Sequence, residues 1–185
     1  MTIKCVDLFE CLNTHCIYRG PTENSLAISV KFETDFDLIL EDVIHSQQKK
    51  QLNFEHQCTK CYKMGTSRAH LFTHVSKYLN VYVRRVQFEN DSHVGIKRPT
   101  VVKFDQTLRI AVTLEDGGTS LKAFTLIGFI MHIGNQASHG HYVCFIKKDG
   151  QWELHDDDKV FVVKPECVFR DFTYKNVYLL TYALL

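Results

Sequence analysis

The chain has 185 residues, enough for one domain with a sizeable core or for a core with a small satellite lobe. Hydrophobic residues make up 45% of it and charged residues 23%, which is the composition of an ordinary soluble globular protein. Its 22 basic and 21 acidic residues leave a formal net charge of +1. We therefore expect no nucleic-acid partner, because duplex binding requires a concentrated basic face.

The sequence predicts neither a membrane span nor an export signal. No run approaches the roughly 20 apolar residues that cross a bilayer. The first residues also lack the charged, apolar and small-residue regions of a secretory signal. Seven cysteines, an odd number, suit a reducing compartment better than a disulfide scaffold. We expect a cytoplasmic or nuclear protein that contacts no membrane.

The first third of the chain predicts one strand and one helix. Apolar residues favour a strand over Leu26–Phe32, and the next apolar pattern predicts a helix from Phe36 to about Gln47. Asp37 is the candidate N-cap of this helix. Glu41 and Asp42 would lie early in the helix, where acidic side chains interact favourably with the helix dipole.

Four of the cysteines form two close pairs, Cys11 with Cys16 and Cys58 with Cys61. Two short knuckles that bring four thiolates together are the usual construction of a closed zinc site, which is structural because no coordination position stays open. Two alternatives remain: His15 could replace Cys16 as a ligand, or the cysteines could be unconnected, with Cys11 buried as a small apolar residue. We expect Zn²⁺ here, supplying much of the folding free energy of a lobe with little core.

From Tyr78 onward the pattern predicts strand after strand. In Tyr78–Val86 the alternation places Leu79, Val81 and Val83 on one face. Further strands are expected at Val101–Phe104, Leu108–Val112, Phe124–His132, His141–Lys147, Gln151–His155, Val160–Val163 and Val177–Leu184, with polar loops at Glu89–Gly95 and Glu115–Ser120. Sequential short strands indicate an antiparallel sheet, so the predicted fold class is α+β, rich in strand, with a zinc-bearing lobe.

A histidine at the start of a predicted strand is the strongest indication of a catalytic site in the chain. In Ser138–Phe145 a Gly-His-aromatic step opens an apolar strand at His141, and the next strand ends in Asp156, Asp157 and Asp158. Antiparallel pairing would bring His141 within hydrogen-bond range of Asp156 or Asp157. A carboxylate there would fix the imidazole tautomer and stabilise its protonated form, so that the other ring nitrogen could act as a general base.

Alternatives stay open for this histidine. It could be a packed or exposed strand residue without a chemical role. It could also belong to a metal cluster with His139, His155 and Asp156, since these side chains could converge. Cys144 would point to the opposite face of a regular strand, so no nucleophile is obvious beside His141.

Taken in chain order, these motifs resemble those of the ubiquitin-specific protease family, which are papain-like deubiquitinating enzymes. The resemblance begins at the two cysteine pairs and continues through Tyr78–Phe88, Gly95–Phe104, Phe124–Gly134, Ser138–Phe145, Trp152–Val160 and Val177–Tyr182. It covers nearly the whole chain from Cys11 onward. Its most specific part is the histidine box together with the Trp-x-x-x-Asp-Asp segment.

The resemblance implies a partial papain-like fold, with a zinc-ribbon fingers lobe at about 9–77 and a palm at about 78–185. It implies that His141 is the general base, Asp156 the orienting acid and Asp157 an assisting carboxylate. The loops Phe88–Arg98 and Gly134–Gly140 would correspond to the two loops that close over the ubiquitin tail in such enzymes. Ubiquitin and ubiquitinated proteins are the implied partners.

Two departures from the family pattern shape the functional expectation. His155 stands where family members carry an aromatic residue. Family members also carry a Gly-Asn-Thr-Cys box with the nucleophile well upstream of the fingers, and no such box is found in these residues. One hypothesis is the histidine-aspartate half of a thiol protease, serving a cysteine on an upstream segment or a partner polypeptide. The other is an inactive pseudo-deubiquitinase that binds ubiquitin as a scaffold.

Overall fold

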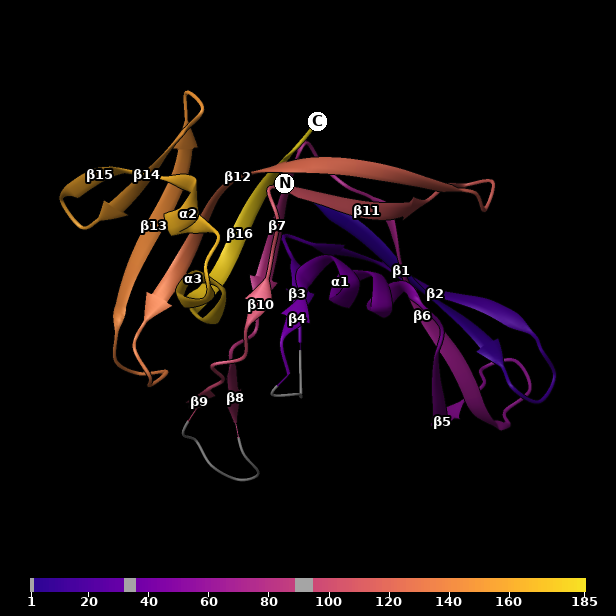
Figure 1. Cartoon of the computed structure of the whole chain (residues 1–185). Helices are drawn as coiled ribbons and strands as arrows, with labels where there is room; N and C mark the ends of the chain where they lie inside the picture. The colour runs from indigo at the N-terminus through magenta and orange to yellow at the C-terminus, as the bar shows by residue number, and fades with distance from the viewer. Residues whose placement is uncertain (1, 32–35, 89–94) are drawn as a thin grey trace.

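The structure, a computed structural model, describes residues 2–31, 36–88 and 95–185. Most of these residues form two β-sheets, and helix α1 (Leu40–Gln48) lies between them (Figure 1). Two short helices, α2 (Pro165–Val168) and α3 (Asp171–Asn176), lie beside the larger sheet. Most strand pairs are antiparallel, which confirms the predicted α+β class rich in antiparallel sheet.

The smaller sheet carries both cysteine pairs in its two hairpin connections. Its strand order is β2-β1-β6-β5, formed by β2 (Ile17–Ser25), β1 (Ile3–Cys11), β6 (Met64–His74) and β5 (Gln51–Gln57). These strands were not predicted from the sequence. The reason is clearest in β2 and β5, which are mostly exposed on both faces and therefore show little hydrophobic alternation.

The larger sheet has the order β15-β14-β13-β12-β16-β7-β3, with β11 also paired to β12. Its strands are β3 (Ile28–Val30), β7 (Tyr78–Val83), β11 (Thr107–Thr113), β12 (Thr119–Ile133), β13 (His141–Lys148), β14 (Gln151–Asp156), β15 (Lys159–Val163) and β16 (Val177–Leu184). The strands predicted for this sheet are all present. The main change is β12, which begins at Thr119 instead of Phe124 because its first half pairs with β11.

The start of helix α1 differs from the prediction. The helix begins at Leu40 instead of Phe36, and no side chain caps it. The two residues before it form strand β4 (Leu38–Ile39), which pairs in parallel with β10 (Val102–Lys103). The prediction of Asp37 as N-cap was therefore wrong, because the chain is still extended there; the Asp37 carboxylate lies 3.3 Å from Lys103 Nζ instead.

The strand predicted over Tyr78–Val86 ends at Val83. Leu79, Val81 and Val83 are buried on one face, as the alternation predicted. Of the expected loop Glu89–Gly95, residues 89–94 lie outside the described part of the chain, and so does Phe32 at the end of an expected strand.

A buried arginine separates β7 from the following hairpin of β8 (Val86–Phe88) and β9 (Gly95–Lys97). The Arg85 side chain is fully buried, and its guanidinium donates to the backbone carbonyls of Arg98, Thr100, Tyr174 and Val177. Backbone acceptors thus satisfy a charge that would otherwise be costly to bury. The hairpin is fastened in this way to the start of β16.

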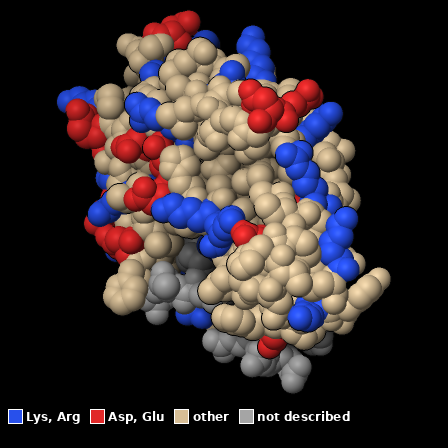
Figure 2. Space-filling model, turned by 90° about the vertical axis from the view of Figure 1, so that its right-hand side faces the viewer, with Lys and Arg blue, Asp and Glu red and all other residues tan. Residues whose placement is uncertain are grey.

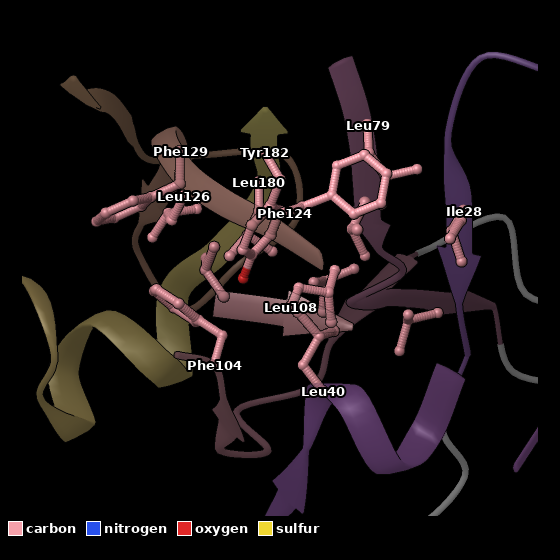
Figure 3. Close-up of a cluster of buried hydrophobic side chains, with 14 of the residues drawn as sticks. Ile28, Leu40, Leu79, Phe104, Leu108, Phe124, Leu126, Phe129, Leu180 and Tyr182 are labelled. Carbon is pink, nitrogen blue, oxygen red and sulfur yellow. The ribbon is translucent and has the colours of Figure 1, made fainter. Parts of the chain in front are cut away.

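One cluster of buried apolar side chains joins the larger sheet to α1. Figure 3 shows Leu40 of α1 close to Leu108 of β11, with Phe124 of β12 and Tyr182 of β16 in the same cluster. Farther along the sheet an aromatic group packs under β13 and β14: the ring of Phe129 stacks on Phe145 at 4.7 Å and lies 6.0 Å from Trp152. This packing fixes the two strands whose ends carry His141 and Asp156.

Charges of both signs are interspersed on the face shown in Figure 2, which agrees with the balanced composition. Within the described ranges, no helix is both long and apolar enough to cross a membrane.

Candidate functional site

His141 and Asp156 lie side by side at one end of the larger sheet. His141 is the first residue of β13 and Asp156 the last residue of β14. The β13–β14 ladder ends at Cys144 and His155, so Asp156 follows one residue later on the face of His141 and Val143. His141 Nε2 and Asp156 Oδ1 are 2.5 Å apart, and the two side chains are 43% and 41% exposed. The pair is therefore open to an incoming group.

A second carboxylate stands next to the pair. Asp157 lies in the turn between β14 and β15 with φ of 53°, a left-handed conformation that aspartate tolerates better than most residues. Ligand-type atoms of His141, Asp156 and Asp157 all lie within 4.8 Å of one another. The hydrogen bond with Asp156 is the largest effect and raises the pKa of His141; burial opposes it, and the charges of Asp156 and then Asp157 add smaller contributions to the rise.

The hydrogen bond decides which ring nitrogen of His141 can do chemistry. Because Nε2 pairs with Asp156, a neutral ring carries its proton on Nε2 and keeps a lone pair on Nδ1. Nδ1 is then the atom that could accept a proton from a thiol.

The residue before His141 has to be glycine. A Cβ on Gly140 would lie 2.2 Å from Nε2 of His132 and 2.5 Å from the carbonyl oxygen of Ile133. His132 is 2% exposed, packs against the ring of Tyr142 at 4.7 Å, and has no hydrogen-bond partner for Nδ1 within the described residues. Burial and, to a smaller extent, the charge of Lys97 lower the pKa of His132, which favours the neutral form of this ring. The strand end that carries His141 is therefore closely packed.

Lys97 anchors the other end of the same loop. Its ammonium donates to the carbonyl oxygens of His132 and Gly134, both at 2.6 Å, and to Asn176 Oδ1 at 2.9 Å. The side chain is 8% exposed, and burial lowers the pKa of Lys97 to about 8. Residues His132–Gly140, which lead into His141, are thus held at both ends. The burial of Lys97 could not be predicted from the sequence, because lysine is rarely buried and nothing in the neighbouring residues indicates it.

The four cysteines of the two pairs converge at the end of the smaller sheet. The sulfur atoms of Cys11 and Cys61 are 3.4 Å apart, as are those of Cys16 and Cys58, and all four lie within 4.8 Å of one another. A tetrahedral zinc ion with Zn–S bonds of about 2.3 Å separates its sulfur ligands by about 3.8 Å. All seven cysteines are free thiols, so the cluster is not a pair of disulfides. Four close thiols at these spacings could bind a metal ion.

The two knuckles have matching backbone geometry. In the first, His15 N–H donates to Cys11 O at 3.0 Å, and in the second, Tyr62 N–H donates to Cys58 O at 2.8 Å. His15 and Tyr62 have positive φ angles of 53° and 58°, which fold each knuckle tightly enough to turn both sulfurs inward. Cys16 supplies the fourth sulfur; His15, the alternative ligand, is exposed and its ring lies 3.6 Å from Glu10.

Thr14 lies beside the sulfurs of the first knuckle. Its hydroxyl donates to Cys16 Sγ at 3.3 Å. Hydrogen bonds from the Thr14 side chain and backbone lower the pKa of the Cys11 thiol to about 6.

The other candidates of the histidine box do not join it. His139 pairs with the Ser138 hydroxyl at 2.8 Å, and His155 pairs with Glu153 at 3.1 Å. The four-residue metal cluster considered from the sequence is therefore not formed; Asp157 takes the place next to His141 and Asp156. Cys144 is three residues from His141 along a regular strand and so points to the opposite face of the sheet.

A family model for ubiquitin carboxyl-terminal hydrolases matches residues 12–182. The chain belongs to this family. Ubiquitin carboxyl-terminal hydrolase 9 of Saccharomyces cerevisiae is 27% identical over 143 residues, which is 75% of this chain and 18% of that protein. Ubiquitin carboxyl-terminal hydrolase 16 of Arabidopsis thaliana is 24% identical over 167 residues, 87% of this chain and 16% of that protein. The chain thus spans less than a fifth of the length of these two hydrolases.

Solved structures agree on the fold of this hydrolase family member. A yeast SAGA DUBm with an Sgf73 mutant superposes with a TM-score of 0.81 at 19% identity, covering 100% of this chain and 41% of that one. The SAGA Ubp8/Sgf11/Sus1/Sgf73 DUB module bound to ubiquitin aldehyde gives the same TM-score of 0.81, identity of 19% and coverages of 100% and 41%. At these identities the likeness establishes the fold, here a partial one.

Proposed function

We propose that residues 1–185 form the histidine-aspartate half of a ubiquitin-specific thiol protease, which completes its site with a cysteine from another segment or polypeptide. The observation that carries the proposal is the 2.5 Å hydrogen bond between His141 and Asp156 in a chain of this hydrolase family. The bond uses Nε2 and leaves Nδ1 for the thiol.

In the proposed reaction His141 moves one proton. Nδ1 takes the proton of the incoming thiol, and the thiolate attacks the carbonyl carbon of the ubiquitin C-terminus to form a thioester after the amine leaves. The imidazolium gives its proton to the departing amine. Asp156 holds the ring and stabilises its charged form, and Asp157 adds a second negative charge nearby. Water then hydrolyses the thioester.

The seven cysteines of the chain support a nucleophile from elsewhere. Four belong to the cluster in the smaller sheet. Burial raises the pKa of Cys144, which lies on the face opposite His141, and burial likewise raises the pKa of Cys5 in β1. Cys167 lies in the short helix α2. A reactive cysteine needs a low pKa and a histidine contact.

Ubiquitin is the partner that fits this proposal. Two of the solved structures with the same fold are DUB modules bound to monoubiquitin and to ubiquitin aldehyde. The division into a fingers lobe at about 9–77 and a palm at about 78–185 is part of the same proposal. So is a structural Zn²⁺ held by Cys11, Cys16, Cys58 and Cys61, whose sulfur spacing suits it.

The test is covalent labelling by a ubiquitin that carries a cysteine-directed electrophile at its C-terminus. The 185-residue chain alone should give no adduct, because losing one member of a catalytic triad costs about as much as losing all of it, on the order of 10⁶ in turnover. Adding a relative's segment with the Gly-Asn-Thr-Cys box, fused or in trans, should produce an adduct on that cysteine.

Matched histidine variants separate the base from its neighbours. His141→Ala should slow the reconstituted labelling by at least about 100-fold, the lower end of a general base's contribution. His139→Ala should slow the labelling far less, since the His139 ring pairs with the Ser138 hydroxyl and takes no part in the His141–Asp156 hydrogen bond. An adduct on a cysteine of the 185-residue chain alone would contradict the proposal. Ubiquitin binding without labelling in any reconstitution would favour the scaffold hypothesis.

A further inference from the structure

A second metal-type ligand set lies away from the cysteine cluster, at the end of β13 and β14. It consists of the His141 ring and the carboxylates of Asp156 and Asp157, with ligand atoms all within 4.8 Å of one another. Imidazole nitrogen and carboxylate oxygen are both ligand types that Zn²⁺ and similar divalent ions accept, and open zinc sites carry three protein ligands.

The distances require only a small adjustment for a bound ion. Ligands about 2.0–2.2 Å from a metal lie about 3.3–3.6 Å apart at tetrahedral angles and about 2.8–3.1 Å apart at octahedral angles. His141 Nε2 and Asp156 Oδ1 are 2.5 Å apart, so the ion would move them apart by roughly 0.3–1.1 Å, depending on its coordination geometry. Both side chains are about two-fifths exposed, and Asp157 lies in a turn, so the three ligand groups have open space beside them. Water can fill the remaining coordination positions.

The structure points to a second divalent transition-metal site, formed by His141, Asp156 and Asp157, that binds Zn²⁺ more weakly than the cysteine cluster. The metal would occupy Nε2, the nitrogen that otherwise donates to Asp156. Starting from the neutral ring, the ring proton then moves from Nε2 to Nδ1. Starting from the protonated ring, the Nε2 proton is released to solvent. In both cases Nδ1 carries a proton and has no lone pair to accept another.

The consequence, which rests on the proposed function, is inhibition. A ring with metal on Nε2 cannot take the proton of a thiol through Nδ1, and the two carboxylates that would stabilise the imidazolium are occupied by the ion. A metal ion would thus block the site in a way that removing it reverses. Metal binding itself depends only on the three side chains and is measurable without ubiquitin.

The experiment is a Co²⁺ and Zn²⁺ titration of the 185-residue chain stripped of metal. The first equivalent of Co²⁺ should show the thiolate charge-transfer absorption of the cysteine cluster. The second equivalent should bind without adding to that absorption, since its ligands are nitrogen and oxygen. Calorimetric titration of the chain preloaded with one Zn²⁺ should likewise find one further, weaker site.

Three variants decide the assignment. His141→Ala and Asp157→Asn should weaken the affinity for the second metal equivalent by at least about tenfold. This is the lower end of the loss seen when even an outer-sphere partner of a metal ligand is removed. Asp158→Asn, a change of the adjacent carboxylate outside the cluster, should leave it unchanged. The first equivalent should bind normally in all three, which shows that each variant is folded.

The proposal is overturned if wild type binds a single equivalent, or if the second equivalent survives unchanged in His141→Ala, which would make it an adventitious ion only. In the reconstituted enzyme, Zn²⁺ beyond the first equivalent should suppress ubiquitin labelling, and a mild chelator should restore it. If no reconstitution ever labels, the proposed function fails, while the titration still tests the metal site.

Discussion

Replacing Lys97 by methionine should destabilise the protein by about 2–4 kcal/mol and loosen the loop before His141. Three acceptors lose their donor: the carbonyl oxygens of His132 and Gly134 and the side-chain oxygen of Asn176. A hydrogen bond with a charged partner contributes about 1.5–3 kcal/mol, so the gross loss is roughly 5–9 kcal/mol. Part of this loss, several kcal/mol, is offset because burying the charged ammonium of Lys97, which is 8% exposed, is itself costly. Methionine has a similar length and no charge, so its burial does not carry that cost.

The pH dependence of stability should change with the same substitution. Burial, with a smaller repulsion from Arg85, lowers the pKa of Lys97 to about 8. The ordinary value is about 10.4, so between these two values the unfolded chain binds more protons than the folded one. The stability of the wild type should therefore rise with pH across this window, and Lys97→Met should lack that part of the rise.

Urea unfolding of both proteins, with Lys103→Met as control, measures these changes. Lys103 is a half-exposed lysine whose ion pair with Asp37 spans 3.3 Å, and such surface pairs contribute at most about 1 kcal/mol. For a chain of this size the Lys97→Met loss corresponds to a fall in Tm of roughly 5–15 °C. Hydrogen exchange should also accelerate in residues 134–141. A loss under about 1 kcal/mol, no larger than that of the control, would refute the anchoring role of Lys97.

Three further changes test the site and the cluster. Cys58→Ser should abolish tight Zn²⁺ binding in metal analysis and sharply lower the stability of the smaller sheet, because bound metal contributes directly to folding free energy. Gly140→Ala should cost at least about 1–3 kcal/mol in urea unfolding, since its Cβ would lie 2.2 Å from the His132 ring; a smaller loss would mean that the ring moves freely. In an NMR titration His141 should show a pKa above the usual 6.5, because Asp156 stabilises the charged ring, and Asp156→Asn should lower it. The stability from this pair should be present below about pH 6.5 and be lost as pH rises through the raised pKa; an unshifted titration in wild type would contradict the pairing.

The sequence predicted the parts of this protein whose information is local. Most strands of the larger sheet follow from hydrophobic alternation and turn residues, because one face of each is buried against a common core; β15, which is mostly exposed, is the exception. The spacing from His141 to the three carboxylates spans one short hairpin, so antiparallel pairing alone brings His141 close to Asp156 or Asp157. The two cysteine pairs predicted a cluster for the same reason, since each knuckle is a turn of a few residues.

Only the tertiary structure decided the features that depend on distant contacts. Strands β2 and β5 of the smaller sheet are mostly exposed on both faces, so their own residues show little hydrophobic periodicity. They form strands because β2 pairs with β1 and β5 pairs with β6. The start of α1 was set by the parallel pairing of β4 with β10, which kept Asp37 extended and prevented it from capping the helix. Lys97 holds the loop before His141 because folding places its ammonium beside carbonyl oxygens 35 and 37 residues away in the sequence. No local sequence pattern predicts a contact between residues so far apart. The choice of Asp156 as the direct partner of His141 follows from the register of β13 on β14, which long-range packing of Phe129 against Phe145 and Trp152 holds in place.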